Sequence, residues 1–284
     1  FILPVWSDYL HLYKMPATRY TIQGRCRMHV RHDSVEFTTR FGRMYDTDLD
    51  ACVAKFSSRP ERRFMPILFF GGSFNPIHHG HLLTAQAAAE QGGFDQVLLV
   101  PSGQPPHKPD HPDLASPEHR FAMCKLAVRG STLFDVTDVE ITRSGPNYTI
   151  DTARELQRKF ASVYNVSAGP PSQSRDPAKD DRIAWLIGAD MLNFLPQWRD
   201  PLALLAEVRF VILARPGWAF AWDTLPAEFQ HLADQVVPAP LIDLSSTRIR
   251  ERVRAGQSID YQTPPDVIRY IHEHGLYREK EPGQ

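Results

Sequence analysis

The strongest constraint on the fold lies where a short apolar run meets a glycine-rich turn. The run is Ile67-Leu68-Phe69-Phe70, and Gly71-Gly72-Ser73-Phe74-Asn75-Pro76-Ile77-His78-His79-Gly80-His81 follows it. Four apolar residues that end in paired glycines are typical of a buried strand that turns sharply. The segment after the turn, residues 82–90, is rich in strong helix formers. The pattern therefore predicts a strand, a turn and a helix, with two histidines where the helix starts.

A helix that starts directly after a buried strand is a common place for a phosphate in an α/β sheet, because free backbone N–H groups and the helix dipole both point at it. The structural alternative is a turn whose histidines only pack or face solvent. The three-glycine fingerprint of dinucleotide-binding folds is absent, so it does not support a phosphate site at this turn. A His-x-Gly-His pattern at one turn, with no side chain at Gly80 to block close approach, is more specific than paired glycines. It favours a phosphate site.

The chain after Met65 alternates predicted strands and helices. Strands are predicted over residues 67–70, 95–100, 134–141, 183–187 and 210–213. Helices are predicted over residues 82–90, 116–129, 148–160 and 245–254, with a further helical segment between the last two strands. This alternation predicts an α/β fold with a Rossmann-like, doubly wound parallel sheet and right-handed crossovers. Sites in such sheets lie at the carboxyl ends of the strands, which would gather His78, Pro101, Asp190 and Arg215.

Composition and charge exclude several classes of protein. Of 284 residues, 42% are hydrophobic and 23% charged, as in ordinary globular proteins. The apolar runs are far too short to cross a bilayer, and the net charge of −1 argues against bulk binding of nucleic acid. Three cysteines, Cys26, Cys52 and Cys124, show no Cys-x-x-Cys spacing, so neither a disulfide framework nor a zinc site is predicted. We expect a cytoplasmic protein with no membrane partner, and whether it forms a homo-oligomer stays open.

A second motif lies near the C-terminus, where an apolar stretch leads into Ser245-Ser246-Thr247-Arg248-Ile249-Arg250. Three small hydroxyl residues at a helix start make a good cap, so a capped amphipathic helix through Arg254 is the structural interpretation. In the functional interpretation, the hydroxyls, the free N–H groups and Arg250 together hold a triphosphate.

The two motifs together resemble a known superfamily. Residues 71–81 are similar to the signature of the His-x-Gly-His nucleotidyltransferases, which are related to class I aminoacyl-tRNA synthetases, and residues 245–250 are similar to their second signature, Ser-Ser-Thr-x-Ile-Arg. From about residue 65 to about residue 277 the chain resembles the nicotinate-nucleotide adenylyltransferases. Ser73 and Asn75 depart from that family's usual Gly-Gly-Thr-Phe-Asp-Pro wording, but they keep a hydroxyl and a short polar group.

The resemblance implies a sheet of the nucleotidyltransferase type and adenylyl transfer from ATP to nicotinate mononucleotide, giving nicotinate adenine dinucleotide and pyrophosphate in NAD biosynthesis. It implies that catalysis rests on His78, His81 and Arg250. The residues implied to bind ATP are Gly72, Ser73, Phe74, His78, His81, Gly188, Asp190, Ser246, Thr247 and Arg250. The residues implied to bind nicotinate mononucleotide are Asn75, Lys108, Tyr148, Thr149 and Trp198.

Several of these residues also have structural interpretations. The prolines before Lys108 in Pro105-Pro106-His107-Lys108 could simply fix the path of a loop. Tyr148 and Thr149 could be part of a turn and a helix cap, although Tyr-Thr-Ile-Asp-Thr is also similar to the family's segment beside the nicotinate pocket. Asp190 could cap the next helix. Trp198 would more often be a core residue than a ligand contact, although its polar neighbours indicate partial exposure.

The implied reaction needs no covalent intermediate, because the attacking 5′-phosphate is already an anion. Catalysis would consist of positioning and neutralisation of charge. His78 and His81 would donate to the α-phosphate oxygens, Lys108 would orient the attacking phosphate, and Arg250 would hold the β- and γ-phosphates. Mg²⁺ would be carried by ATP, so no metal-ligand cluster is expected.

Other functions stay open at this point. The alternatives are an adenylyltransferase for nicotinamide mononucleotide or pantetheine phosphate, and a non-catalytic nucleotide-binding regulatory module. A tRNA synthetase would need tRNA-binding domains for which the chain has no room.

Residues 1–64 differ from the rest of the chain. They hold 11 Lys/Arg against 7 Asp/Glu, whereas the remainder is acidic, and they show no clear helical or strand period. Met65 stands directly before the first predicted strand. We therefore expect a weakly ordered extension that is not part of the enzyme, with an extra subdomain as the alternative, then one domain over residues 65–278 and a tail over 279–284. A Ser/Pro/Asp-rich stretch at about 164–181 is expected to be a mobile loop.

Overall fold

The computed structural model divides the chain into two compact units, Phe1–Arg62 and Arg63–Gln284. The residues that it describes are 20–22, 26–31, 34–38, 67–105, 113–164, 182–214, 217 and 219–278. The predicted mobile loop lies outside these residues except at its first residue, 164, and the predicted tail lies wholly outside them.

The first unit contains a three-stranded antiparallel sheet in the order β1-β2-β3. The strands are β1 (Tyr20–Ile22), β2 (Cys26–Arg31) and β3 (Ser34–Thr38). The expectation that this stretch lacks a strand period is wrong. Apolar Cys26, Met28 and Val30 alternate with basic residues along β2, which is the period-two pattern of a strand.

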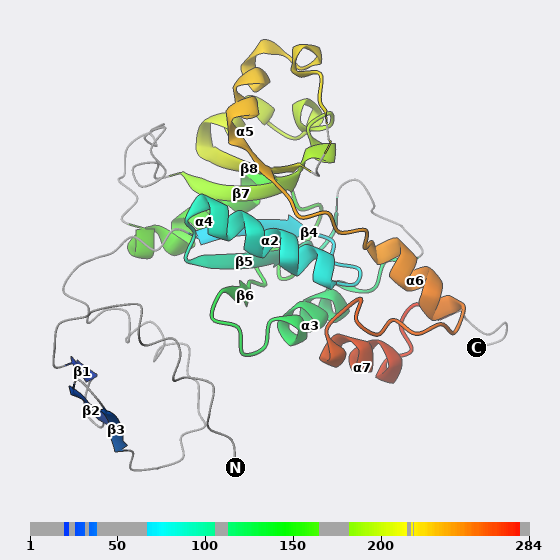
Figure 1. The fold of residues 1–284 in the computed structure, drawn as a ribbon. Coiled ribbons are helices and arrows are strands. Elements are labelled where there is room, and N and C mark those ends of the chain that lie inside the picture. Colours follow the sequence, from blue (N-terminus) through cyan, green and yellow to red (C-terminus); the bar gives the residue numbers. More distant parts are fainter. Residues whose placement is uncertain are drawn as a thin grey trace. The chain divides into compact units, whose positions relative to one another are not determined.

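The second unit is built around a six-stranded parallel sheet in the order β6-β5-β4-β7-β8-β9 (Figure 1). Its strands are β4 (Ile67–Gly72), β5 (Gln96–Pro101), β6 (Phe134–Val136), β7 (Ile183–Gly188), β8 (Val208–Ala214) and β9 (Val236–Pro238). The chain moves outward from β4 through β5 to β6, then returns to β7 on the other side of β4. The neighbours β4 and β7 therefore form the topological switch point, where doubly wound sheets hold their ligands.

Helices cover both faces of this sheet, which confirms the predicted doubly wound α/β fold. They are α2 (His79–Gly92), α3 (Pro117–Ala127), α4 (Thr149–Tyr164), α5 (Pro201–Glu207), α6 (Ser246–Arg254) and α7 (Pro265–Glu273). Short 3-10 helices are η1 (Ala189–Met191), η2 (Leu195–Gln197), η3 (Trp222–Thr224) and η4 (Ala227–Gln235). Among the described residues, no helix is both long and apolar enough to span a membrane.

Two hydrophobic cores lie on opposite faces of the sheet. Buried residues of α4 and α5 pack with Phe69 and Trp185 in one core. Buried residues of α2, α3, α6 and α7 pack with Leu68 and Leu99 in the other. Successive side chains of a strand point to opposite faces, so the continuous apolar run of β4 supplies both cores at once.

Three elements differ from the sequence-based expectations. The strand predicted over residues 134–141 ends at Val136, because the chain turns at Asp138, whose carbonyl accepts from the Ile141 N–H at 2.9 Å. Neither β9 nor α7 is among the predicted elements. β9 has only three residues, which is too short for a periodic signal, whereas α7 carries Val267 and Ile271 at helical spacing on its buried side.

Candidate active site

The turn after β4 places two histidines in a reciprocal cap at the start of α2. His78 is the N-cap residue, and its Nδ1 accepts a hydrogen bond from the His81 N–H at 3.3 Å. His81 Nδ1 accepts in turn from the His78 N–H, also at 3.3 Å. The two rings stack with their centroids 3.7 Å apart. A neutral imidazole that accepts at Nδ1 carries its proton on Nε2, so both side chains present an Nε2–H donor.

Both imidazoles are neutral at pH 7. Burial, and in second place the charge of His79, lowers the pKa of His78 to about 4. Burial also holds the pKa of His81 well below its ordinary value, with neighbouring His78 as the second cause. The pair can therefore stabilise negative charge through hydrogen bonds that do not require a cation.

This protonation state predicts how stability depends on pH. An unfolded histidine titrates near pH 6.5 and folded His78 near 4, so the unfolded chain binds more protons between these values. The contribution of His78 is fully present above pH 6.5 and is lost as the pH falls toward 4. His78→Asn keeps a cap acceptor and does not titrate. We expect the melting temperature of the wild type to fall relative to that of His78→Asn between pH 6.5 and 4, and a constant difference would contradict the assignment.

Two of the three N–H groups in the first turn of α2 have hydrogen-bond partners, whereas the Gly80 N–H has none among the described residues, and a phosphate site at this turn stays a prediction. The histidine cap takes the His81 N–H, and the His79 N–H donates to the Gln262 carbonyl at 3.0 Å. The lack of a side chain at Gly80 lets the His78 ring pack closely against the backbone, because a Cβ at this position would lie 2.9 Å from His78 Nδ1. The donors that remain at the start of α2, among the described residues, are the Gly80 N–H and the two imidazole N–H groups.

Residues from the C-terminal part of the chain donate hydrogen bonds to the backbone carbonyls of three consecutive residues of the turn. The pairs are Arg250 Nη1 with Asn75 O at 2.9 Å, Ser246 Oγ with Pro76 O at 2.8 Å, and Thr263 Oγ1 with Ile77 O at 2.7 Å. We call Ser246, Arg250, Gln262 and Thr263 the C-terminal clamp. Sequence reasoning misses Gln262 and Thr263, because hydrogen bonds between residues as many as 186 positions apart leave no local pattern.

The second motif therefore supports the first. Ser245 caps α6 by accepting from the Arg248 N–H at 3.3 Å. Arg250 is 7% exposed, and its Nη2 donates to Thr247 Oγ1 at 3.4 Å. Within the described residues, the N–H groups of Ser246 and Thr247 have no hydrogen-bond partner. The start of α6 therefore keeps two free amides beside a buried guanidinium.

Two side chains of the first motif build the turn. The Asn75 carboxamide donates to Asp113 O at 2.8 Å, and its Oδ1 accepts from the Ala115 N–H at 3.0 Å and the Tyr277 hydroxyl at 2.8 Å. These contacts use both ends of the side chain and favour a structural role for it; that Asn75 binds substrate stays a prediction. The buried ring of Phe74 packs edge-on against the His81 ring, with centroids 5.2 Å apart, and so supports that ring rather than facing outward.

The start of α4 lies beside the loop that follows β5. The Asn147 N–H donates to the Gln104 carbonyl at 3.0 Å, and the Gln104 N–H donates to Asn147 Oδ1 at 2.6 Å. In the described part of the chain, the N–H groups of Tyr148 and Thr149 have no hydrogen-bond partner. They stand at the N-terminus of a 16-residue helix, which favours an anion.

Trp198 and Tyr148 both pack against the core on the α4 side of the sheet. The Trp198 Nε1–H is buried without a hydrogen-bond partner among the described residues. The Arg199 guanidinium lies over the Tyr148 ring at 4.8 Å, and it pairs with Asp151 at 3.6 Å. Trp198 therefore packs partly against the core, as tryptophans commonly do, while its indole N–H keeps no hydrogen-bond partner among the described residues.

The remaining predicted residues fall into two groups. Pro101 is the last residue of β5. Asp190 lies in η1, just after Gly188 ends β7, and is exposed. Because the strands are parallel, Pro101 and Asp190 lie at the same edge of the sheet as the histidine turn. Lys108 and Arg215 lie outside the described residues. Their roles stay predictions.

A buried carboxyl group, Glu140, lies next to this edge and is not among the predicted residues. Its Oε1 accepts from Thr152 Oγ1 at 2.6 Å, and burial raises its pKa to about 7. Its backbone carbonyl accepts from Asn147 Nδ2 at 3.3 Å. A Cβ on Gly103 would lie 2.2 Å from the same carbonyl, so only glycine lets the loop after β5 pass here.

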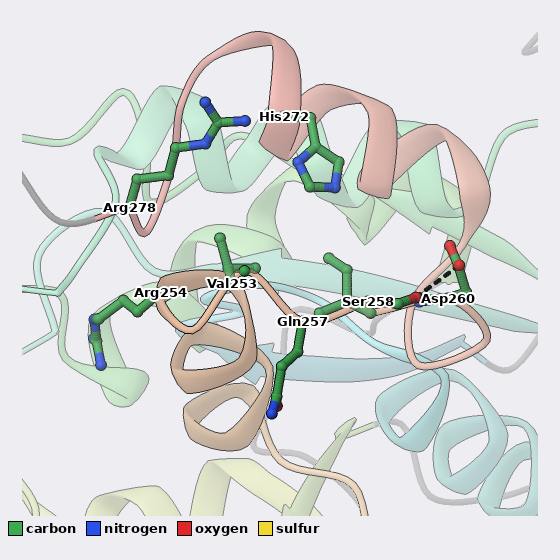
Figure 2. A pocket seen from close by; sticks show the side chains of 9 residues that line it. Val253, Arg254, Gln257, Ser258, Asp260, His272 and Arg278 are labelled. Carbon is green, nitrogen blue, oxygen red and sulfur yellow. Dashed lines mark hydrogen bonds between the residues drawn. The ribbon is translucent and has the colours of Figure 1, made fainter.

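Two hollows open near the C-terminal helices and the loop after β5. One, of about 360 Å³, is lined by residues of that loop and of the entry to α3. The other, of about 590 Å³, lies among α6, α7 and the loop that joins them; Figure 2 shows Arg278 and His272 on one side of it and Gln257 on the other. None of the predicted site residues lines the larger hollow. In the described part of the chain, no group of three or more His, Cys, Asp or Glu side chains could hold a metal ion.

The fold and the paired histidines define a class of enzyme, the nucleotidyltransferases, and the family model described as Cytidylyltransferase-like matches residues 69–252. The probable nicotinate-nucleotide adenylyltransferase of Opitutus terrae is 40% identical over 218 residues, which cover 76% of this chain and 100% of the relative. That of Halalkalibacterium halodurans is 41% identical over 212 residues, covering 74% and 90%. The chain belongs to the nicotinate-nucleotide adenylyltransferase family.

Solved structures agree in fold. The Plasmodium falciparum nicotinic acid mononucleotide adenylyltransferase complexed with APC matches with a TM-score of 0.54 and 16% identity, over 75% of this chain and 97% of that one. At this level of identity the similarity concerns the arrangement of strands and helices and not the individual side chains.

Proposed function

We propose that this enzyme transfers the adenylyl group of ATP to nicotinate mononucleotide, giving nicotinate adenine dinucleotide and pyrophosphate in NAD biosynthesis. The observation that carries the proposal is the reciprocal histidine cap, which presents two neutral Nε2–H donors at the topological switch point of the sheet. The names of the relatives support the choice of the two substrates.

The reaction requires positioning and charge stabilisation. An oxygen of the 5′-phosphate forms a bond to the α-phosphorus of ATP, the bond from that phosphorus to the bridging oxygen breaks, and pyrophosphate leaves with the electron pair. No proton has to move, since nucleophile and leaving group are both anions. His78 and His81 donate to the α-phosphate oxygens as their charge grows, and such preorganised donors stabilise the transition state.

The second motif holds the leaving group in this proposal. The free N–H groups of Ser246 and Thr247, at the N-terminus of α6, are suited to the β- and γ-phosphates. Arg250 adds a positive charge there while it fixes the turn through Asn75. Asp190, exposed after β7, accepts from the ribose hydroxyls of ATP in this proposal.

The acceptor lies on the other side of the turn. The free N–H groups of Tyr148 and Thr149 take the pyridine carboxylate, and Trp198 stacks on the pyridine ring. Lys108, in the loop after β5, orients the attacking phosphate. The paired backbones of Asn147 and Gln104 support this arrangement, because they hold that loop beside the start of α4.

Mg²⁺ enters the proposal as a partner of ATP. The described residues offer no carboxylate cluster that would hold the ion by itself, and Mg²⁺ commonly binds nucleotide phosphates while it keeps several waters. When bound, it neutralises part of the triphosphate charge. The cytoplasm stays the predicted location of the enzyme.

The experiment that tests the function is product formation from ATP with nicotinate mononucleotide, nicotinamide mononucleotide and pantetheine phosphate in parallel. We expect pyrophosphate and the dinucleotide to appear together, in equal amounts, with nicotinate mononucleotide as the preferred acceptor. Pyrophosphate release with a different preferred acceptor would refute the assigned substrate, and ATP binding without release would indicate a regulatory module.

We further propose that residues 1–64 are dispensable for folding and catalysis. Every assigned motif lies after Met65, and the chain divides into compact units at Arg62 and Arg63. A shortened chain that begins at Met65 should keep the melting temperature and kcat/KM of the full chain, because stability falls only when buried contacts are lost. A drop of several degrees would correspond to about 1 kcal/mol of docking and would make the first unit part of the enzyme.

A further inference from the structure

One buried arginine connects the two loops of the proposed site. Arg120 belongs to α3 and is 0% exposed. Each of its three guanidinium nitrogens donates to a backbone carbonyl: Nε to Ala115 at 2.9 Å, Nη1 to Ser73 at 2.9 Å and Nη2 to Gly103 at 2.8 Å. The three carbonyls belong to three segments, namely the entry to α3, the turn after β4 and the loop after β5.

Stability alone does not explain why a charged side chain is buried at this place. A guanidinium that is removed from water loses hydration, and apolar residues of similar volume often replace buried charges without loss of stability. Among the described residues, the hydrogen bonds of Arg120 go to neutral carbonyls, and burial lowers its pKa. An apolar side chain could fill the same space, but it could not supply three donors in a fixed planar fork.

The two loops that Arg120 joins carry the two halves of the reaction. Ser73 precedes the turn that leads to His78, the proposed donor to the α-phosphate of ATP. Gly103 precedes Gln104, whose backbone pairs with Asn147 at the start of α4, where the acceptor is proposed to bind. Parallel β4 and β5 already lie side by side, with Gly72 opposite Pro101, and Arg120 fixes the separation of the chain just beyond them.

We propose that Arg120 is a positioning residue, which sets the distance between the ATP loop and the acceptor loop so that the attacking phosphate meets the α-phosphorus in line. The proposal rests on the proposed function. Because its guanidinium is buried and bonded to carbonyls, Arg120 acts in this proposal through Ser73 and Gly103 rather than on a substrate. Its removal should therefore disturb the alignment of the bound substrates more than the binding of each one.

The test is Arg120→Lys, which keeps the positive charge but loses the fork that reaches three carbonyls. We expect kcat to fall by about 10–100-fold, the scale on which small misplacements of reactants act. The Kd of ATP and that of nicotinate mononucleotide, each measured alone by calorimetry, should change by less than about 3-fold on the same argument. The matched control is Arg154→Lys, because Arg154 also uses two guanidinium nitrogens, but on Glu207 at the surface. Its kcat should stay at the wild-type value.

Several results would overturn the positioning role. One is a wild-type kcat in Arg120→Lys, and another is a tenfold rise of both Kd values together with a lower melting temperature, which would indicate general loss of structure. Arg120→Met serves as the second variant, and if neither variant folds, Arg120 serves stability alone. A wild-type enzyme that does not adenylylate nicotinate mononucleotide would instead refute the proposed function, before any variant is compared.

Discussion

Replacing His81 by asparagine is expected to lower kcat by about 10²–10³-fold while the protein stays folded. Asparagine places an oxygen where His81 Nδ1 accepts from the His78 N–H, so the cap is retained. It has no atom at the Nε2 position, so the donor to the transferred phosphate is lost. The loss should appear in kcat more than in the KM for ATP, because this donor acts on charge that develops in the transition state. Steady-state kinetics and the melting temperature measure the two effects.

Two further variants separate catalysis from stability at this turn. His81→Ala removes the cap acceptor as well as the donor, so it should lose as much kcat and in addition about 1 kcal/mol of stability. His79→Asn is the control, because only the backbone N–H of His79 bonds to Gln262, and it should keep nearly full activity. Near-normal turnover of His81→Asn would remove His81 from the mechanism.

Nicotinate mononucleotide should be preferred to nicotinamide mononucleotide by about 10³-fold in kcat/KM. The proposed pocket at the start of α4 offers two backbone donors, Tyr148 and Thr149, and a carboxylate can accept from both. A carboxamide would turn its NH₂ group toward one of them. One lost hydrogen bond to a charged group and the cost of leaving its buried donor unpaired, at about 2 kcal/mol each, together correspond to this ratio.

A backbone substitution tests which atoms set this preference. Thr149 is the first residue of α4, a position where proline fits a helix well and removes only the N–H. Thr149→Pro should therefore lower kcat/KM for the nicotinate substrate by about 10–30-fold, the value of one such bond, and leave the nicotinamide substrate nearly unchanged. Thr149→Ala, which keeps the N–H, is the matched control and should keep the ratio. Equal use of both substrates by the wild type would contradict the pocket.

Local patterns in the sequence predicted the elements that frame the site. The apolar run of β4, the glycines after it and the helix formers of α2 are neighbours in the chain, so their pattern reports their structure directly. Ser116 followed by Pro117 likewise predicts the start of α3, where the structure has Ser116 as N-cap. The strand predicted from residue 134 is too long because the turn after Val136 again alternates between apolar and polar residues, with Val139 and Ile141 apolar.

What could not be predicted depends on contacts between distant parts of the chain. His78 and His81 were identified by their spacing, but their mutual cap and neutral state depend on burial, which the pattern does not contain. Ser246 and Arg250 were expected to face phosphates, whereas their side chains also bond to the carbonyls of the first motif. Arg120 reads as an ordinary helix residue, since neither its burial nor its three carbonyl partners leave a trace in the nearby sequence.

The C-terminal clamp has a consequence for the order in which the enzyme is made. Its hydrogen bonds to the histidine turn join residues 170, 175, 183 and 186 positions apart. During synthesis on the ribosome, β4, β5 and their helices emerge long before Ser246 and Thr263. The backbone carbonyls of the turn therefore lack these hydrogen-bond partners until the C-terminal part of the chain has been made. Contacts of such long range also form slowly, because the intervening chain must first be closed into a loop. We therefore expect the histidine turn to be among the last parts of the domain to reach its final geometry, and the nascent protein to gain activity only once its final helices have docked.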